Sequence, residues 1–370
     1  MAIISFKGVG ITALAAAVPA QIIDNYKYDL DIWPEDEVRQ VVDKVGVKQR
    51  RFADEQTCSS DLCYAAAEKL IADNHINRND IDLLVFLSQT PDYRMPATSI
   101  LLQERLHLPT STMAFDISLG CSGFLSALTI VYSMMQNNGF HKALLLDGET
   151  RSKVYNRKDR REAFIFGDAG IAALIERDDK FTESHFSINS DGSRSNLIMI
   201  PAGGYRHMSS VETLKEKVVD EYGNIRSDEN GHMNGADVFG FVISEVPKDI
   251  KRLCEVVGED IHSMDYYVFH QANAFINNYV AKKMKLDESK MPCTIDKYGN
   301  TSSVSVPLTI VSELKNKLTG HHKLLLSAFG VGMAWGTAIL PFVDTRINDI
   351  VEVLNGNILS SVSMLTRVGD

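Results

Sequence analysis

Cysteine is scarce in this chain, and the few cysteines present do not suggest a disulfide framework. The 370 residues include five cysteines, an odd number in a long chain. Small secreted domains that depend on disulfides are much richer in cysteine, whereas thiols stay reduced in the cytoplasm. We therefore expect a cytoplasmic protein whose fold does not rely on disulfides.

Long apolar runs and an excess of positive charge are also missing. The longest apolar stretch, residues 124–135, is shorter than the roughly 18 residues that a membrane-spanning helix needs. The N-terminus shows no basic segment followed by a long apolar core, so we expect neither a signal peptide nor a membrane span. Lysine and arginine number 38 against 48 for aspartate and glutamate, which gives a net charge of −10. Because a nucleic-acid-binding face must be basic, we expect no nucleic-acid partner.

The composition that remains is typical of a globular protein. Apolar residues make up 45% of the chain and charged residues 23%, which excludes a disordered or collagen-like polypeptide. At roughly 150 residues per domain, the length predicts two domains or two fused halves.

The sequence also contains two pairs of similar segments about half a chain apart. Residues 82–89 resemble residues 265–271, a shift of 183 positions (265 minus 82). Residues 141–146 resemble residues 322–326, a shift of 181 positions (322 minus 141). Chance similarity between buried strands is the alternative explanation. Two matches at nearly one shift nevertheless favour duplicated halves.

These repeated segments are short apolar runs, as expected for strands covered on both faces. Helical patterns occur at residues 61–71, 242–257 and 274–286. Strands alternating with helices predict an α/β fold. The polar stretch 205–232 predicts an exposed excursion at the junction of the halves, and residues 350–359 predict a terminal helix or strand.

The sharpest local feature surrounds Cys121, which lies between Gly120 and Gly123. A strand is expected to end near Asp116, and a strongly apolar helix to cover residues 122–136. A cysteine at a helix N-terminus is favoured as a thiolate by the unpaired N–H groups and the helix dipole. The two glycines are expected to leave room for an extended substrate. The alternative is that Cys121 is a small buried hydrophobic residue.

His270 and Asn300 are two further candidates. His270 ends an apolar strand just before a helix that is expected to begin near Ala274, and α/β folds place their sites at such strand ends. Asn300 lies in a turn before the apolar helix 304–314. A structural histidine and a capping asparagine are the simpler interpretations.

Motifs for a metal or a nucleotide cofactor are not evident. Cys58 and Cys63 are five residues apart, which suits neither a redox pair nor a zinc site. The glycine-rich turn 329–336 has the wrong spacing for a dinucleotide fingerprint. Such a turn can instead direct a backbone N–H into a site, and we expect no metal.

Together these motifs resemble the thiolase superfamily, and within it the β-ketoacyl-acyl carrier protein synthase III family. The matching motifs, in the family's order, are Gly-Cys-Ser-Gly at 120–123, Phe-Gly-Asp at 166–168, Met-Asn-Gly at 233–235, His-Gln-Ala-Asn at 270–273, Tyr-Gly-Asn-Thr-Ser at 298–302 and the turn at 329–336. The resemblance covers roughly residues 3–342.

The resemblance implies a thiolase-like α/β fold in which two duplicated βαβαβαββ halves stack in five layers, α-β-α-β-α. It divides the chain into a first half at 1–178 that carries the nucleophile, a second half at 179–345 that carries His270 and Asn300, and a C-terminal extension at 346–370.

The resemblance also implies a mechanism. The Cys121 thiolate takes an acyl group from an acyl thioester and condenses it with a malonyl thioester, which loses carbon dioxide. His270 and Asn300 donate hydrogen bonds to the thioester oxygen on which enolate charge develops, and the backbone N–H groups of Cys121 and Val331 form the oxyanion hole. The implied substrates are acyl-coenzyme A and malonyl-acyl carrier protein, with no permanently bound cofactor.

The same resemblance implies a homodimer in which residues 91–96 reach across the interface, with Met95 at an acyl gate. It places Arg160 beside the adenine of coenzyme A. A family tryptophan that stacks on this adenine has no aromatic counterpart near Gln40, and Phe275 replaces a family arginine that meets the acidic carrier.

These departures leave the acyl donor and the acceptor open. The alternative function is acyl transfer to an alcohol or amine in a specialised pathway, without decarboxylation. The intact Cys121, His270 and Asn300 set argues against a catalytically silent subunit.

Overall fold

The computed structural model describes residues 3–137 and 139–354, and two mixed β-sheets form its framework. The first sheet has the central order β2 (Val9–Pro19), β8 (Asp168–Arg177), β7 (Lys142–Thr150), β5 (Leu83–Leu87) and β6 (Met113–Ile117). The second sheet has the order β1 (Ile3–Phe6), β9 (Ser184–Ser190), β16 (Ala334–Val343), β15 (His321–Gly330) and β14 (Tyr266–Phe269).

Four strands of each sheet repeat the same pattern of pairing. In the first sheet β5 is parallel to β7, and β7–β8 and β8–β2 are antiparallel. In the second sheet β14 is parallel to β15, and β15–β16 and β16–β9 are antiparallel. The similar segments of the sequence lie on matching strands, namely β5 and β14 for one pair, and β7 and β15 for the other. The repeated sequence thus reflects repeated topology.

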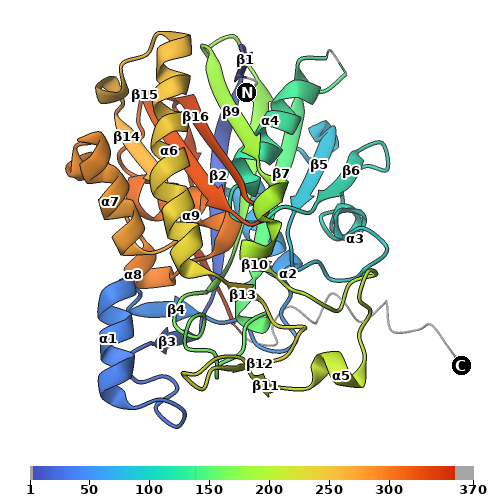
Figure 1. Cartoon of the computed structure of the whole chain (residues 1–370). Helices are drawn as coiled ribbons and strands as arrows, with labels where there is room; N and C mark the ends of the chain where they lie inside the picture. The colour runs from blue at the N-terminus through green and yellow to red at the C-terminus, as the bar shows by residue number, and fades with distance from the viewer. Residues whose placement is uncertain (1–2, 138, 355–370) are drawn as a thin grey trace, which may run out of the picture.

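Helices complete the five layers that the family resemblance implies (Figure 1). The inner layer contains α4 (Gly123–Met135) and α9 (Ser305–Leu314). The first sheet is covered outside by α2 (Ser59–Asp73) and α3 (Thr98–Arg105), and the second by α6 (Gly235–Val257) and α7 (Ala274–Met284). The remaining helices are α1 (Glu35–Val45), α5 (Val211–Leu214) and α8 (Ile295–Tyr298).

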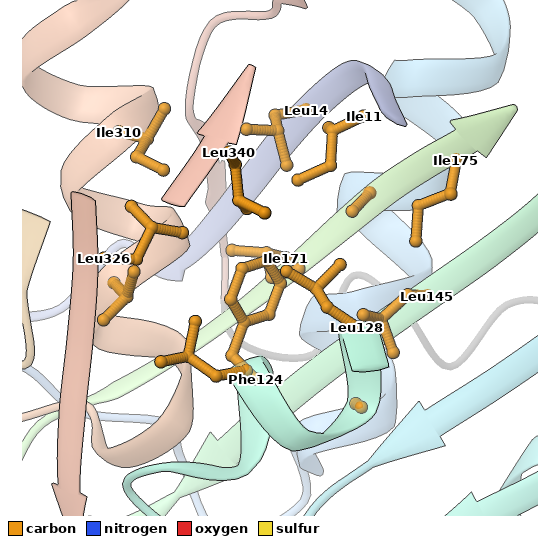
Figure 2. Close-up of a cluster of buried hydrophobic side chains, with 14 of the residues drawn as sticks. Ile11, Leu14, Phe124, Leu128, Leu145, Ile171, Ile175, Ile310, Leu326 and Leu340 are labelled. Carbon is orange, nitrogen blue, oxygen red and sulfur yellow. The ribbon is translucent and has the colours of Figure 1, made fainter. Parts of the chain in front are cut away.

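The inner helices are apolar all round because both sheets pack against them (Figure 2). Phe124 and Leu128 of α4 lie among side chains of both sheets, including Leu145 and Leu326. Burying each such side chain contributes about 1.5–3 kcal/mol. This core fixes the end of β6 and the start of α4, between which Cys121 lies.

The strands do not keep strictly to the predicted division of the chain. β1 belongs to the first half in sequence but pairs with β9 in the second sheet. Beyond residue 345, β17 (Arg346–Ile347) and β18 (Val351–Val353) pair parallel to β2, so the described part of the extension is an edge of the first sheet. A strand thus covers part of the expected element at 350–359, and the rest lies outside the described residues. The boundaries at 178 and 345 stay a prediction.

The second half also differs from an exact repeat. Within the described residues its sheet has no counterpart of β6. Residues 291–301, which include α8, stand where such a strand would come in the sequence, between α7 and α9. Residues around Asn300 instead pair with the first half, through backbone hydrogen bonds from Asn300 to Ile165 (2.9 Å) and from Gly167 to Asn300 (3.1 Å). An irregular segment therefore joins the two halves at the site.

The prediction that the polar excursion at 205–232 lies at the junction of the halves is wrong. The excursion lies inside the second half. It runs between β10 (Ile198–Met199) and β13 (His232–Met233) and carries α5 and the ribbon β11 (Lys217–Val218) and β12 (Ile225–Arg226). It packs on the first half, because Ile225 N–H donates to the Lys158 carbonyl (2.9 Å) and Arg226 pairs with Asp159 (2.7 Å). The excursion therefore holds the segment that follows β7 in place.

Two short strands, β3 (Ile22–Asp24) and β4 (Gln49–Arg51), form an antiparallel pair on either side of α1 in the sequence. Among the described helices, none is both long enough and apolar enough to cross a membrane.

Candidate active site

Cys121 lies in the short connection between β6 and α4, directly before the N-cap Ser122. Its side chain is buried, with 5% of the residue exposed. The end of β15 comes so close that a Cβ atom on Gly330 would lie 2.6 Å from the Cys121 sulfur. Only glycine allows this approach, which brings the glycine-rich turn after β15 onto the sulfur.

The surroundings of Cys121 favour the thiolate. Burial raises the pKa of the thiol, but the charge and a hydrogen bond of His270 oppose it, followed by the charge of Arg151 and the backbone N–H of Val331. Together these contacts lower the pKa of Cys121 to about 6. Since the reactive form of cysteine is the thiolate, this thiol is ionised at neutral pH.

The interpretation of Gly120 and Gly123 as openings for substrate is wrong. A Cβ on Gly120 would clash with the side chain of Gln89, and one on Gly123 would lie 2.9 Å from Leu87. Protein atoms fill both positions. These glycines serve close packing around Cys121, so a substrate must approach the sulfur from another direction.

His270 follows β14 directly, as predicted, and is 1% exposed. Its Nδ1 atom lies 2.6 Å from the hydroxyl of Ser305, at the start of α9, and its ring packs edge-on against Phe329 at 5.4 Å between centroids. These two contacts fix the ring and leave Nε2 for the sulfur or for a substrate.

Asn300 is fixed by its backbone and its side-chain oxygen. Its Oδ1 accepts a hydrogen bond from Ser302 N–H (2.9 Å), so the NH₂ group is the part that can donate to a ligand. The hydroxyl of Ser302 lies 3.9 Å from the Cys121 sulfur. The segment that carries Asn300 therefore reaches the nucleophile directly.

Ser302 and Ser305 are site residues that the sequence analysis missed. Ser302 has a positive φ of 56°, in the left-handed region that few residues other than glycine adopt. The motif Tyr-Gly-Asn-Thr-Ser contains Ser302, but only the fold shows that its side chain turns towards residue 121. The contact spans 181 positions in the sequence.

The structure places Arg160 away from these groups, on the segment between β7 and β8. It forms an ion pair with Glu37, and its guanidinium lies 5.7 Å from the ring centre of Trp33. The family resemblance places a tryptophan beside the adenine-binding arginine near position 40, where this chain has Gln40 and no aromatic residue. Trp33, seven residues earlier, supplies the aromatic neighbour instead.

Phe275, on the first turn of α7, lies in an aromatic surface cluster. Its ring is 5.2 Å from that of Phe239, which also contacts Tyr279 at 5.6 Å. Phe275 is half exposed. The family has an arginine at this position of the surface, whereas in this chain the same surface is apolar.

The three site motifs thus meet at one place, and comparisons with known proteins agree. Residues 115–192 match the family model described as 3-oxoacyl-[acyl-carrier-protein (ACP)] synthase III, and residues 254–342 match the model of its C-terminal part. These two matches include Cys121, His270, Asn300 and Val331.

Whole proteins of the same kind match over most of the chain. A β-ketoacyl-[acyl-carrier-protein] synthase III of Streptococcus agalactiae is 33% identical over 336 residues, which cover 89% of this chain and 98% of the relative. One from Clostridioides difficile is 32% identical over 90% of this chain and 97% of the relative. A crystal structure of a 3-oxoacyl-(acyl-carrier protein) synthase from Burkholderia xenovorans LB400 has a TM-score of 0.89 and 37% identity, covering 95% of this chain and 99% of that one.

Proposed function

The chain belongs to the 3-oxoacyl-[acyl-carrier-protein] synthase III family, and from that premise we propose how its site works. The protein is an acyltransferase that condenses an acyl group with a malonyl thioester to give a 3-oxoacyl thioester. The observation that carries the proposed mechanism is the convergence of His270 and the Val331 N–H on the Cys121 sulfur.

In the first step the Cys121 thiolate attacks the carbonyl carbon of acyl-coenzyme A. The new C–S bond forms as the bond to coenzyme A breaks, and the released thiolate takes a proton from solvent. Negative charge appears on the carbonyl oxygen in between. The backbone N–H groups of Cys121 and Val331 are the donors we assign to this oxygen. The pKa of about 6 ensures that the nucleophile is already ionised.

In the second step a malonyl group on acyl carrier protein loses carbon dioxide. The electron pair of the broken C–C bond becomes an enolate, whose oxygen accepts hydrogen bonds from His270 Nε2 and the Asn300 NH₂. The enolate carbon then attacks the acyl carbon, and Cys121 leaves as the thiolate. Ser305 and Ser302 orient the two donors in this scheme.

Acyl-coenzyme A and malonyl-acyl carrier protein are the substrates of this scheme, which uses no bound cofactor or metal. For the nucleotide end of coenzyme A we propose the surface at Arg160 and Trp33, where a cation and an aromatic ring lie together. Arg160 must then exchange its ion pair with Glu37 for a contact with the nucleotide.

A homodimer in the cytoplasm completes the proposal. All five cysteines are free, which suits a reducing compartment. Residues 91–96 present the side chains of Tyr93 and Met95 to solvent, 60% and 76% exposed. Exposed apolar side chains of this size on a short loop favour a partner surface.

The test is the mass of the product formed from acyl-coenzyme A and malonyl-acyl carrier protein. Condensation adds two carbons to the acyl chain and releases one carbon dioxide per turnover. The unchanged acyl group on an added alcohol or amine, without carbon dioxide, would instead establish acyl transfer without decarboxylation. The Cys121→Ala variant should form neither product.

A further inference from the structure

A cavity of about 530 Å³ adjoins the site, and the mechanism above leaves it unused. Its lining residues are Tyr28 before α1 and residues from the segments 50–55 after α1 and 151–166 between β7 and β8. Two wall residues connect it to the site. Phe166 lies between the two residues that bond the Asn300 backbone, and the charge of Arg151 contributes to the low pKa of Cys121.

Two guanidinium groups in this wall are buried and form no direct ion pair with a carboxylate of the described residues. Arg50 is 2% exposed and Arg151 4% exposed. No carboxylate oxygen of the described residues lies within 4.0 Å of a nitrogen of either group. Their hydrogen-bond partners are neutral: Asn25 and the Phe166 carbonyl for Arg50, and the Tyr155 hydroxyl for Arg151. Arg50 Nη2 and Arg151 Nε have no hydrogen-bond partner among the described residues.

Aromatic faces provide part of the missing stabilisation. The guanidinium of Arg50 lies over Phe52 at 4.6 Å, and that of Arg151 lies 5.3 Å from the centre of the Tyr155 ring. Tyr155 stacks on Phe166 at 4.1 Å. Cation–π contacts of this kind stabilise a buried cation by less than it loses when it leaves water.

Acidic groups near the cavity favour these cations through their charge but form no ion pair with them: Asp29 and Asp168 act on Arg50, and Glu149 acts on Arg151. Asp54 and Glu55 also line the cavity without pairing with either cation. The oxygens of Glu149 accept hydrogen bonds from Gln89 and Thr90, and burial raises its pKa to about 7. Glu162 is buried in the cavity wall, and neither of its oxygens makes a well-formed hydrogen bond. Burial and then the charge of Asp159 raise the pKa of Glu162 to about 8, so this carboxyl is mostly protonated at neutral pH.

Buried cations in proteins are almost always paired, so the two guanidinium groups call for an anion. A planar carboxylate matches the fork of a guanidinium, and a protonated Glu162 can donate a further hydrogen bond to it. We propose that this cavity binds the carboxylate end of the acyl group that Cys121 carries, so that the preferred acyl donor is the monothioester of a dicarboxylic acid. The inference rests on the proposed acylation of Cys121 and adds the class of acyl group.

The test compares two coenzyme A esters that differ only in charge at the far end. Succinyl-coenzyme A carries a carboxylate where 4-methylpentanoyl-coenzyme A carries an isopropyl group of similar shape. The rate of acylation is followed by intact-protein mass spectrometry. We expect the succinyl ester to acylate wild type at least about tenfold faster, as befits a charge-assisted hydrogen bond.

Variants at position 151 assign this preference to the cavity. Arg151→Leu should lower the ratio of the two rates about tenfold or more, and Arg151→Lys should keep part of the preference. The ratio is used because Arg151 also influences the reactivity of Cys121. Lys158→Met is the matched control, since Lys158 is a nearby cation paired with Glu216 at the surface. Its ratio should equal that of wild type.

Calorimetric binding of both esters to Cys121→Ala separates this inference from the proposed function. Tighter binding of the succinyl ester to Cys121→Ala supports the cavity assignment. If wild type forms no acyl-enzyme with either ester, that result refutes only the acylation mechanism and leaves the cavity assignment standing. Acylation of wild type that favours the 4-methylpentanoyl ester, or that does not distinguish the two, overturns the inference and leaves the condensing activity intact. Both wild-type measurements remain decisive if Arg151→Leu fails to fold.

Discussion

At the scale of single residues, the reactivity of Cys121 depends on groups that compete with its own burial. Burial alone would suppress the thiolate, and His270, Arg151 and the Val331 N–H outweigh it. These groups come from both halves of the chain. The nucleophile is therefore activated only in the assembled fold.

The first prediction concerns the pH dependence of this thiol. Alkylation of Cys121 by iodoacetamide should rise with pH to half its maximal rate near pH 6, because the thiol with a pKa of about 6 is protonated below that value and ionised above it. His270→Ala removes the largest lowering influence, so its midpoint should move up towards the ordinary value of about 8.5. The rate is measured by peptide mass spectrometry between pH 5 and 9.

Cysteine 254 provides an internal comparison in the same samples. Burial raises the pKa of Cys254 to about 11, so it should react far more slowly below pH 8. Equal midpoints for Cys121 in wild type and His270→Ala would contradict the role given to the histidine.

The second prediction separates the two steps of the reaction. Asn300→Ala should still take up an acyl group at Cys121, because the groups that lower the pKa of the thiol most are His270, Arg151 and the Val331 N–H. Loss of a donor to the enolate oxygen should slow release of carbon dioxide from a malonyl thioester by about 100- to 1,000-fold. Single-turnover acylation and carbon dioxide release are measured side by side. An equal loss in both steps would show that Asn300 does not act at the enolate.

Sequence motifs could locate Cys121, His270 and Asn300 because each follows a strand or turn with a local signature. They could not locate Ser302 or Arg151 as neighbours of the sulfur. Those contacts join residues that the fold brings together, and no local pattern of residue types encodes them. The mistaken interpretation of Gly120 has the same cause, since the side chain that fills its space belongs to Gln89.

At the scale of elements, the turn between β15 and β16 is the part of the second half that touches the nucleophile. The third prediction is that Gly330→Ala lowers condensing activity at least about tenfold, because its methyl group would lie 2.6 Å from the Cys121 sulfur. Overpacking of this kind costs about 1–3 kcal/mol, so a lower melting temperature is also expected.

Gly240 in α6 offers a matched control for this substitution. Apart from its chain neighbours and the nearby backbone of its own helix, no atom lies within 4 Å of a Cβ built there, so Gly240→Ala should keep full activity. It should also raise stability by about 0.5–1 kcal/mol, as alanine favours a helix. Full activity in Gly330→Ala would mean that the turn can move away from the sulfur.

The sequence predicted the long elements well, because two strands of the first half resemble two strands of the second half at nearly one shift. It did not predict β17, which is two residues long, and it predicted the three-residue β18 only as part of a terminal helix or strand at 350–359. Strands this short carry too little alternation to recognise, and their position depends on β2, more than 300 residues earlier in the chain. The sequence also did not reveal that the second half lacks a counterpart of β6. This difference depends on the pairing of residues 165–167 with Asn300, which only the fold brings together.

At the scale of the whole molecule, the excursion at 205–232 and the loop at 91–96 form one surface. Arg94 donates a hydrogen bond to the Gly203 carbonyl (2.7 Å), and its guanidinium lies 5.5 Å from the ring centre of Tyr205. Tyr205 and Met208 of the excursion are both exposed. The excursion thus enlarges the apolar surface around Met95 and at the same time holds the cavity segment in place.

The fourth prediction is that this surface joins two copies of the chain. Light scattering at micromolar concentration should give about twice the monomer mass of 41.1 kDa. Met95→Lys places a charge at the centre of the apolar loop. The variant should therefore be monomeric, or its dimer should dissociate at a much higher protein concentration than that of wild type. Val256→Lys on α6 adds the same charge at another exposed apolar position, 62% exposed, and should leave the dimer intact.

If residues 91–96 also shape the partner's acyl site, the monomeric variant should lose condensing activity in proportion to its loss of dimer, and activity should return at high protein concentration. A wild-type mass of one chain would refute the dimer. A Met95→Lys dimer as stable as wild type would move the interface to another face of the molecule.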